Sequence, residues 1–124
     1  MTTRQHRNPW FRSEVRTDLS AETWAYIAGI FDGEGHLRHH QGAWRLRISQ
    51  VTASGLCQWL WDTVGTGALT VITHQPANRK PMLLWRCDRQ ADILDFLLHV
   101  EPYIIVKRDI TERALADLGV CRRH

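Results

Sequence analysis

Two carboxylates stand at the end of an apolar segment, in the sequence Asp32-Gly33-Glu34-Gly35. Glycine lacks a side chain and lets the backbone come close to a second helix or to a ligand. A carboxylate oxygen is a hard ligand that suits Mg²⁺, which is typically bound by one or two carboxylates together with phosphate and water. Glu34 is therefore a candidate metal ligand. The alternative is a solvated carboxylate in a turn.

A set of cationic side chains is the second candidate for chemistry. Residues 36–50 and 69–88 alternate apolar and polar side chains, which predicts two hairpins. At a period of two, the polar side chains share one face of the sheet. The predicted members of this face are Arg38, His40, Arg45, Arg47, Thr70, Ile72, His74 and Arg86. An ordinary solvated face would carry both acidic and basic residues, whereas the charged residues of this face are basic, with Asp88 as the exception.

A helix must position Glu34 at its end. Ser20 is a suitable N-cap for a helix that runs to the glycines at 33 and 35. Small residues along one face of a helix let a second helix pack closely, because no side chain separates the two backbones. That face is predicted to consist of Ala25, Ala28, Gly29 and Asp32.

Further elements follow from periodicity and from turn residues. Helices are predicted over 54–64, 91–99 and 103–118, and Gln41-Gly42 is a hairpin signal. The order helix, hairpin, helix, hairpin, helices predicts an α+β fold around one antiparallel sheet. Residues 1–19 are predicted to form an irregular basic arm, residues 20–118 the domain, and residues 119–124 a short basic tail.

Composition narrows the possible partners. The chain has 124 residues with a formal charge of +3, which suits one domain and favours polyanionic partners. Its three cysteines are widely spaced and suggest neither a disulfide framework nor a zinc ribbon. We expect neither a signal peptide nor a membrane-spanning segment. The expected location is the cytoplasm or nucleoid, or an organelle if the gene lies there, and not outside the cell.

Residues 27–35, IAGIFDGEG, resemble the signature motif of the LAGLIDADG homing endonucleases. Three further segments resemble that family in the same order: Arg47 to Gln50, Val64 to Gly67 and Pro102 to Arg108. The resemblance covers residues 20–118. It implies an αββαββα fold with a curved, four-stranded antiparallel sheet and helices on one face.

The resemblance also implies roles for particular side chains. Glu34 matches the position whose carboxylate binds a divalent metal, and Asp32 matches a mainly structural position. Gln50 matches a residue that orients water, and Lys107 matches a basic residue that helps to stabilise charge on the attacked phosphate. Without the resemblance, Gln50 is a polar residue at a strand end and Lys107 a solvated lysine. The cationic face is expected to enter the major groove, where Arg45 and Arg47 read bases.

The chain carries one signature motif, whereas two helix ends are needed to cut two strands. The resemblance therefore implies a homodimer that uses Mg²⁺, or another divalent cation, to hydrolyse double-stranded DNA at a near-palindromic site. It also implies a role in the homing of an intron or another mobile element, with no small-molecule substrate. The alternatives are a non-cleaving nucleic-acid-binding protein of the same fold, such as an RNA-splicing maturase or a transcriptional regulator, and a metal-free protein-interaction module.

Overall fold

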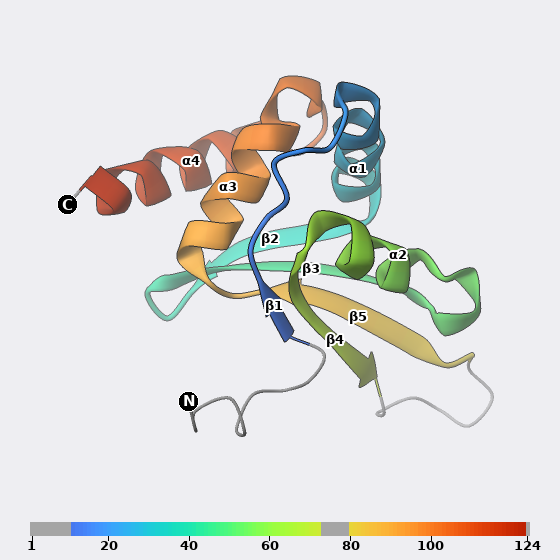
Figure 1. The fold of residues 1–124 in the computed structure, drawn as a ribbon. Coiled ribbons are helices and arrows are strands. Elements are labelled where there is room, and N and C mark those ends of the chain that lie inside the picture. The colour runs from blue at the N-terminus through green and yellow to red at the C-terminus, as the bar shows by residue number, and fades with distance from the viewer. Residues whose placement is uncertain (1–10, 73–79, 124) are drawn as a thin grey trace, which may run out of the picture.

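The computed structural model describes residues 11–72 and 80–123 and has the predicted α+β architecture, with helices on one face of an antiparallel sheet (Figure 1). The elements in chain order are β1 (Phe11–Ser13), α1 (Ala21–Glu34), β2 (Gly35–His40), β3 (Ala43–Val51), η2 (Thr52–Ser54), α2 (Leu56–Val64), β4 (Thr66–Ile72), β5 (Met82–Cys87), α3 (Gln90–Val100), η3 (Glu101–Tyr103) and α4 (Arg108–Arg123).

The two predicted hairpins are confirmed. The strand order is β1-β4-β5-β3-β2, so the hairpins β2–β3 and β4–β5 meet in the middle of the sheet through the antiparallel pair β3–β5. Gln41 and Gly42 both have positive φ, 52° and 83°. Two consecutive positive φ angles are typical of the turns that match the twist of a tight hairpin. Because β3 pairs with β5, the two hairpins form one continuous sheet.

A fifth strand, β1, was not predicted. Residues 11–13 were assigned to an irregular arm, but they pair with β4 from Phe11 opposite Ala68 to Ser13 opposite Thr66. Without β1, β4 would be an edge strand with unpaired backbone groups, and even a short added strand satisfies several of them. Val15 and Leu19 then pack against the core. The folded unit thus includes residues that were predicted to precede it, whereas residues 1–10 lie outside the described part.

The core lies between the helices and the sheet and contains several aromatic rings. Phe96 of α3 contacts Phe31 of α1 and Trp85 of β5, with ring centroids 5.8 and 5.5 Å apart. All three side chains are fully buried. The predicted N-cap is also confirmed, because the Ser20 hydroxyl accepts a hydrogen bond from the Thr23 amide at 3.1 Å. These contacts fix α1 on the sheet and so fix where α1 ends.

The last helix differs from its prediction at both ends. A helix was predicted over 103–118, but α4 begins at Arg108 and continues to Arg123. The helix starts later than predicted because the backbone amides of residues 105–107 donate hydrogen bonds to the Asp32 carboxylate and not to carbonyl oxygens of a preceding helical turn. Its end extends over part of the predicted tail. No helix in the described ranges is both long enough and apolar enough to cross a membrane.

Candidate functional site

The C-terminal end of α1 brings together two of the predicted catalytic residues. Glu34 is the last residue of α1 and its side chain is exposed. Gln50, near the end of β3, donates from Nε2 to Glu34 Oε1 over a long 3.4 Å. The Oε1 atom of Gln50 accepts from the Val51 amide at 3.0 Å, which orients the amide group of Gln50 so that its NH₂ faces the carboxylate.

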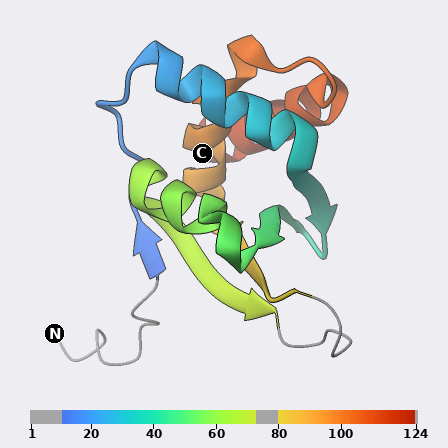
Figure 2. The same cartoon turned by 90° about the vertical axis from the view of Figure 1, so that its right-hand side faces the viewer.

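Gly35 explains why Glu34 lies so close to the sheet. It follows α1 directly and pairs with Ile48 of β3, so β2 begins without an intervening loop (Figure 2). A Cβ atom at this position would lie 2.6 Å from the ring of Phe31 and 2.7 Å from the Phe31 carbonyl oxygen. Only glycine allows the chain to turn from α1 into β2 this tightly, and the turn places Glu34 next to Gln50.

Asp32 and Lys107 contact each other at the same helix end. The Asp32 carboxylate accepts hydrogen bonds from the amides of Ile105, Val106 and Lys107 at 2.8, 3.0 and 2.8 Å. In return, Lys107 Nζ donates to the Asp32 carbonyl oxygen at 2.8 Å. Partial burial alone would raise the pKa of Asp32, but the three backbone hydrogen bonds outweigh it and the pKa is lower than usual. Asp32 therefore stays ionised and sets the position of Lys107.

The open face of the sheet collects most of the predicted DNA-binding residues. Arg38 of β2 lies opposite Arg45 of β3, and Arg47 of β3 lies between His36 and Arg86. A hollow of about 500 Å³ on this face is lined by His36, Arg38, His40, Arg45, Arg47, Ser49, Ile72 and Leu84. Thr70 and Arg86 are joined outside this lining by a hydrogen bond of 3.2 Å. His74 lies outside the described residues.

The charges on this face are arranged unfavourably for an isolated sheet. Like charges directly opposite each other on neighbouring strands destabilise the pair, yet arginines face each other at 38 and 45 and at 47 and 86. Asp88 offsets the second pair, with ion pairs of 2.7 Å to Arg47 and 2.6 Å to Arg86. Within the described ranges, Arg38 and Arg45 have no acidic partner. A polyanion would supply the missing negative charge.

The predicted packing face of α1 is wrong at Ala28. Ala28 is 0% exposed in the single chain, so it cannot contact a second molecule. It shares the buried side of α1 with Ile27 and Phe31, which face the core. Ala25 is half-buried, and the Asp32 carboxylate binds its own chain. Of the four predicted residues, Gly29 alone is exposed.

The exposed strip of α1 runs instead along Tyr26, Gly29 and Gly33. The Tyr26 side chain is 61% exposed, and a Cβ atom at Gly29 or Gly33 would meet nothing within 4 Å. The sequence carries this signal, because positions 26, 29 and 33 recur at helical spacing. Sequence reasoning included Gly29 in the packing face but did not identify the strip as a whole, because apolar residues surround the helix on most sides and no charge contrast marks the exposed face.

Exposed apolar side chains lie on other elements near this strip. Trp59 of α2 makes an edge contact with Tyr26, with ring centroids 5.4 Å apart. Near the end of α1, Ile105 and Val106 are 81% and 78% exposed although their amides are bound by Asp32. Large apolar side chains that a rigid backbone presents to solvent are typical of a surface that another molecule covers.

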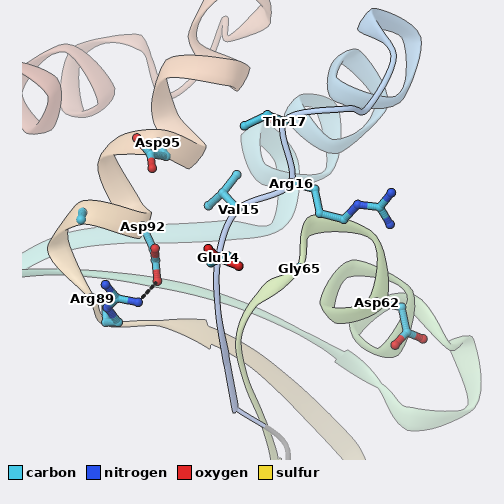
Figure 3. Close-up of a pocket in the computed structure, with 10 residues that line it drawn as sticks. Glu14, Val15, Arg16, Thr17, Asp62, Gly65, Arg89, Asp92 and Asp95 are labelled. Atoms are coloured by element: carbon cyan, nitrogen blue, oxygen red, sulfur yellow. Dashed lines mark ion pairs between the residues drawn. The ribbon is translucent and has the colours of Figure 1, made fainter.

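A second hollow of about 660 Å³ lies where the link from β1 to α1 passes between α2 and α3 (Figure 3). None of its described lining residues is a predicted site residue. Its buried carboxylate, Asp92, accepts a hydrogen bond from Thr66 at 2.8 Å and forms an ion pair with Arg89 at 3.5 Å (Figure 3). Burial raises the pKa of Asp92. These partners give Asp92 a structural explanation, so the larger hollow is not the candidate site.

Comparison of structures relates this geometry to known proteins. No protein-family model matches the chain, and no curated protein matches it by sequence. The structure is similar to the homing endonuclease I-CvuI in complex with its target, with a TM-score of 0.67 and 17% identity over 80% of this chain and 67% of that one. It is also similar to the meganuclease I-SmaMI bound to DNA, with a TM-score of 0.64 and 17% identity over 81% of this chain and 37% of that one.

A third similar structure is the archaeal intron-encoded homing endonuclease I-Vdi141I complexed with DNA, with a TM-score of 0.60 and 15% identity over 79% of this chain and 67% of that one. The chain thus has the homing-endonuclease fold, which confirms the fold that the sequence resemblance implied. It spans about two thirds of the I-CvuI chain and little more than a third of the I-SmaMI chain.

Proposed function

We propose that the chain is a site-specific DNA endonuclease that hydrolyses phosphodiester bonds with the help of a divalent cation and acts as a homodimer. The observation that carries this proposal is the contact of Gln50 with Glu34 at the end of α1, where Lys107 also binds the Asp32 carbonyl oxygen, on a sheet whose open face is rich in arginine. The fold shared with DNA-bound homing endonucleases supports the same conclusion. Double-stranded DNA is the proposed substrate.

The exposed strip of α1 supports the homodimer. In a two-fold dimer the same patch of both subunits forms the interface, and Gly29 and Gly33 would let two copies of α1 come close. With the two-fold axis along the pair of helices, such packing brings the C-terminal ends of both α1 helices together, so that each subunit contributes one Glu34 and each Glu34 serves one DNA strand. Because the two subunits are identical, the preferred DNA site is a near-palindrome.

Glu34 fits a divalent cation by its donor chemistry. Its carboxylate is exposed and receives one long hydrogen bond from Gln50. No group of three or more His, Cys, Asp or Glu residues that could hold a metal ion occurs among the described residues. The Asp32 carboxylate at the same helix end is bound by three backbone amides, which leaves Glu34 as the proposed ligand. This suits Mg²⁺, which keeps several waters and takes its other ligands from phosphate. When bound, a divalent cation lowers the pKa of a water and neutralises charge on the phosphate. The I-CvuI complexes were obtained with Ca or Mg present.

The other residues act by position and charge. The Gln50 amide holds the Glu34 carboxylate on one side and is the group proposed to orient the attacking water. Lys107 places a positive charge at the same helix end, where it can stabilise negative charge that develops on a phosphate. Its contact with the Asp32 carbonyl oxygen fixes that charge in place before DNA arrives. The arginines of the open face supply binding energy.

The alternative is a protein of the same fold that binds nucleic acid without cutting it. One observation favours it: Lys107 Nζ already has a main-chain partner and lies 5.9 Å from the centre of the Phe31 ring, as a purely structural lysine would. Both readings place nucleic acid on the same sheet face. Strand cleavage therefore decides between them.

The test uses duplex DNA that the protein itself selects from a random library, then cloned in a supercoiled plasmid. With Mg²⁺, the unaltered protein should linearise the plasmid. Glu34→Gln should lower the cleavage rate by at least about 100-fold and leave binding unchanged, because it removes a charged metal ligand at the reacting centre. Glu22→Gln is the matched control, since it makes the same change in the first turn of α1.

Three outcomes are distinct. Cleavage that Glu34→Gln abolishes and Glu22→Gln retains supports the enzyme. Tight, sequence-selective binding without strand breaks supports the non-cleaving alternative. Absence of salt-dependent DNA binding contradicts both, because affinity that arises from phosphate contacts must fall steeply as salt concentration rises.

A further inference from the structure

Asp88 is an acidic residue on a surface that is otherwise cationic, and it contacts two arginines at once. Its Oδ1 lies 2.7 Å from Arg47 Nη1 and its Oδ2 lies 2.6 Å from Arg86 Nη1. Arg47 and Arg86 are register partners on β3 and β5. One carboxylate therefore bridges two guanidinium groups that would otherwise repel each other across the sheet.

The backbone of Asp88 is itself held in place. Gln90 Nε2 donates to the Asp88 carbonyl oxygen at 2.8 Å and to the Trp44 carbonyl oxygen at 3.0 Å. Gln90 Oε1 accepts from the Trp44 amide at 2.9 Å. These bonds fasten the turn between β5 and α3 to the start of β3. The backbone of Asp88 is therefore held in place, and its carboxylate can orient the two arginines that it binds.

The hydrogen bonds leave the two arginines with different remaining donors. Arg86 uses Nη1 for Asp88 and Nε for the Thr70 hydroxyl. Arg47 uses Nη1 for both Asp88 and the Leu46 carbonyl oxygen. The Nε and Nη2 donors of Arg47 have no partner within the described ranges. Two neighbouring donors of this kind are what a bidentate contact with guanine O6 and N7 requires.

We propose that Asp88 is a positioning residue for sequence recognition: it holds the Arg47 guanidinium in one orientation, so that Arg47 reads a guanine in the target DNA. This inference rests on the proposed DNA binding. Arg47 also lines the hollow of the open face, where a base edge would have to lie. Arg38 and Arg45 have no carboxylate of this kind among the described residues, so their guanidinium groups are less constrained.

Affinity alone does not account for Asp88. A carboxylate on a surface that binds a polyanion repels the phosphates and lowers affinity. Asp88 offsets the repulsion between Arg47 and Arg86, and its proposed benefit to DNA recognition is orientation, which increases the penalty for a wrong base. Removing the charge of Asp88 should therefore raise the affinity for DNA and lower the preference for one base, so one experiment can separate the two effects.

The experiment compares the unaltered protein with Asp88→Asn, by sequencing the duplexes that each selects from a random library and by measuring Kd at low and high salt. Asp88→Asn should bind non-selected DNA about fivefold more tightly at low salt, since one negative charge is gone. It should also lose about tenfold of its preference for guanine at one position in each half-site. Asp88→Glu, which keeps the charge, should restore part of that preference.

Arg47→Lys should lose the preference at the same position, because lysine cannot make the bidentate contact. The double variant should lose no more than Arg47→Lys alone, since Asp88 acts only through Arg47. Asp109→Asn, which removes a carboxylate from the first turn of α4, is the matched control and should leave the selected sequence unchanged.

An Asp88→Asn protein that selects the same guanine as strongly as the unaltered protein overturns the inference and leaves the proposed function standing. A loss spread evenly over all positions also overturns it. If the unaltered protein does not bind DNA, both the inference and the proposed function are wrong. Melting temperatures of all variants check that the fold is retained.

Discussion

The Asp32 side chain contributes to both the fold and the candidate site. Its carboxylate binds three consecutive amides in the segment that leads into α4, and its carbonyl oxygen binds Lys107 Nζ. Hydrogen bonds to a charged acceptor are stronger than those between neutral groups. Removing the acceptor would leave three donors without their partner and would release Lys107 from the end of α1.

Asp32→Ala should lower the free energy of unfolding by about 1–2 kcal/mol at neutral pH. The pKa of Asp32 is lowered in the folded protein, so its stabilising effect is full above the unfolded value of about 4 and is lost as pH falls through the folded value. The difference between the two proteins should therefore shrink below about pH 4. Urea denaturation at pH 7 and pH 3 measures it.

Asp18→Ala is the control for Asp32→Ala, because Asp18 pairs with Arg16 in solvent and its loss should change stability little. Equal losses for the two variants, or a difference that does not depend on pH, would contradict the role assigned to Asp32.

At the scale of elements, the sequence patterns correctly predicted those features that depend on residues close together in the chain. The cap at Ser20, the turn at Gln41-Gly42 and the alternation along 44–50 depend on neighbours in the chain, and the structure has all three features. The contact of Glu34 with Gln50 follows from the hairpin that returns β3 to the end of α1.

Features that depend on distant residues could not be predicted. The start of α4 is set by Asp32, which lies 73 positions before Ile105. The orientation of Arg47 depends on Asp88, 41 positions later. The strand β1 has three residues, too few to show an alternation, and it forms because β4 offers an edge. Ala28 was misplaced because α1 is apolar on most sides, so the sequence alone does not identify its exposed face.

The junction between the β1–α1 link and α2 yields a prediction at this scale. Gly65 ends α2 with φ of 88°, and a Cβ atom there would lie 2.7 Å from the Glu14 carbonyl oxygen. Gly55 also has positive φ, 72°, but its Cβ position is open. Gly55→Ala should cost about 1 kcal/mol for the backbone conformation alone, and Gly65→Ala should cost at least about twice that because the link must also move.

Urea denaturation of both alanine variants measures this difference. Equal losses would mean that the segment around Glu14 moves aside without cost, and the link would then contribute little to the fold. A larger loss for Gly65→Ala would show that the link between β1 and α1 packs firmly against the end of α2. The 2.7 Å hydrogen bond from the Arg16 amide to the Val64 carbonyl oxygen supports this expectation.

At the scale of the whole molecule, one surface has features that a single chain does not explain. Along α1, Gly29 and Gly33 leave the backbone uncovered, and Tyr26, Ile105 and Val106 expose large apolar area nearby. Glycine in the middle of a helix destabilises it by about 1 kcal/mol relative to alanine. A close approach of a second helix compensates for that cost, and the proposed homodimer provides one.

Gly29→Leu should leave the monomer folded and no less stable, because a Cβ atom at this exposed position would meet nothing within 4 Å and leucine favours a helix more than glycine does. The same side chain should separate two packed copies of α1. Sedimentation velocity should then show monomers where the unaltered protein forms dimers, and cleavage of both strands of one site should be lost. Gly119→Leu is the matched control, since Gly119 is a helical glycine with an equally open Cβ position on α4. A dimer that persists in both Gly29→Leu and Gly33→Leu would place the interface on another face of the molecule.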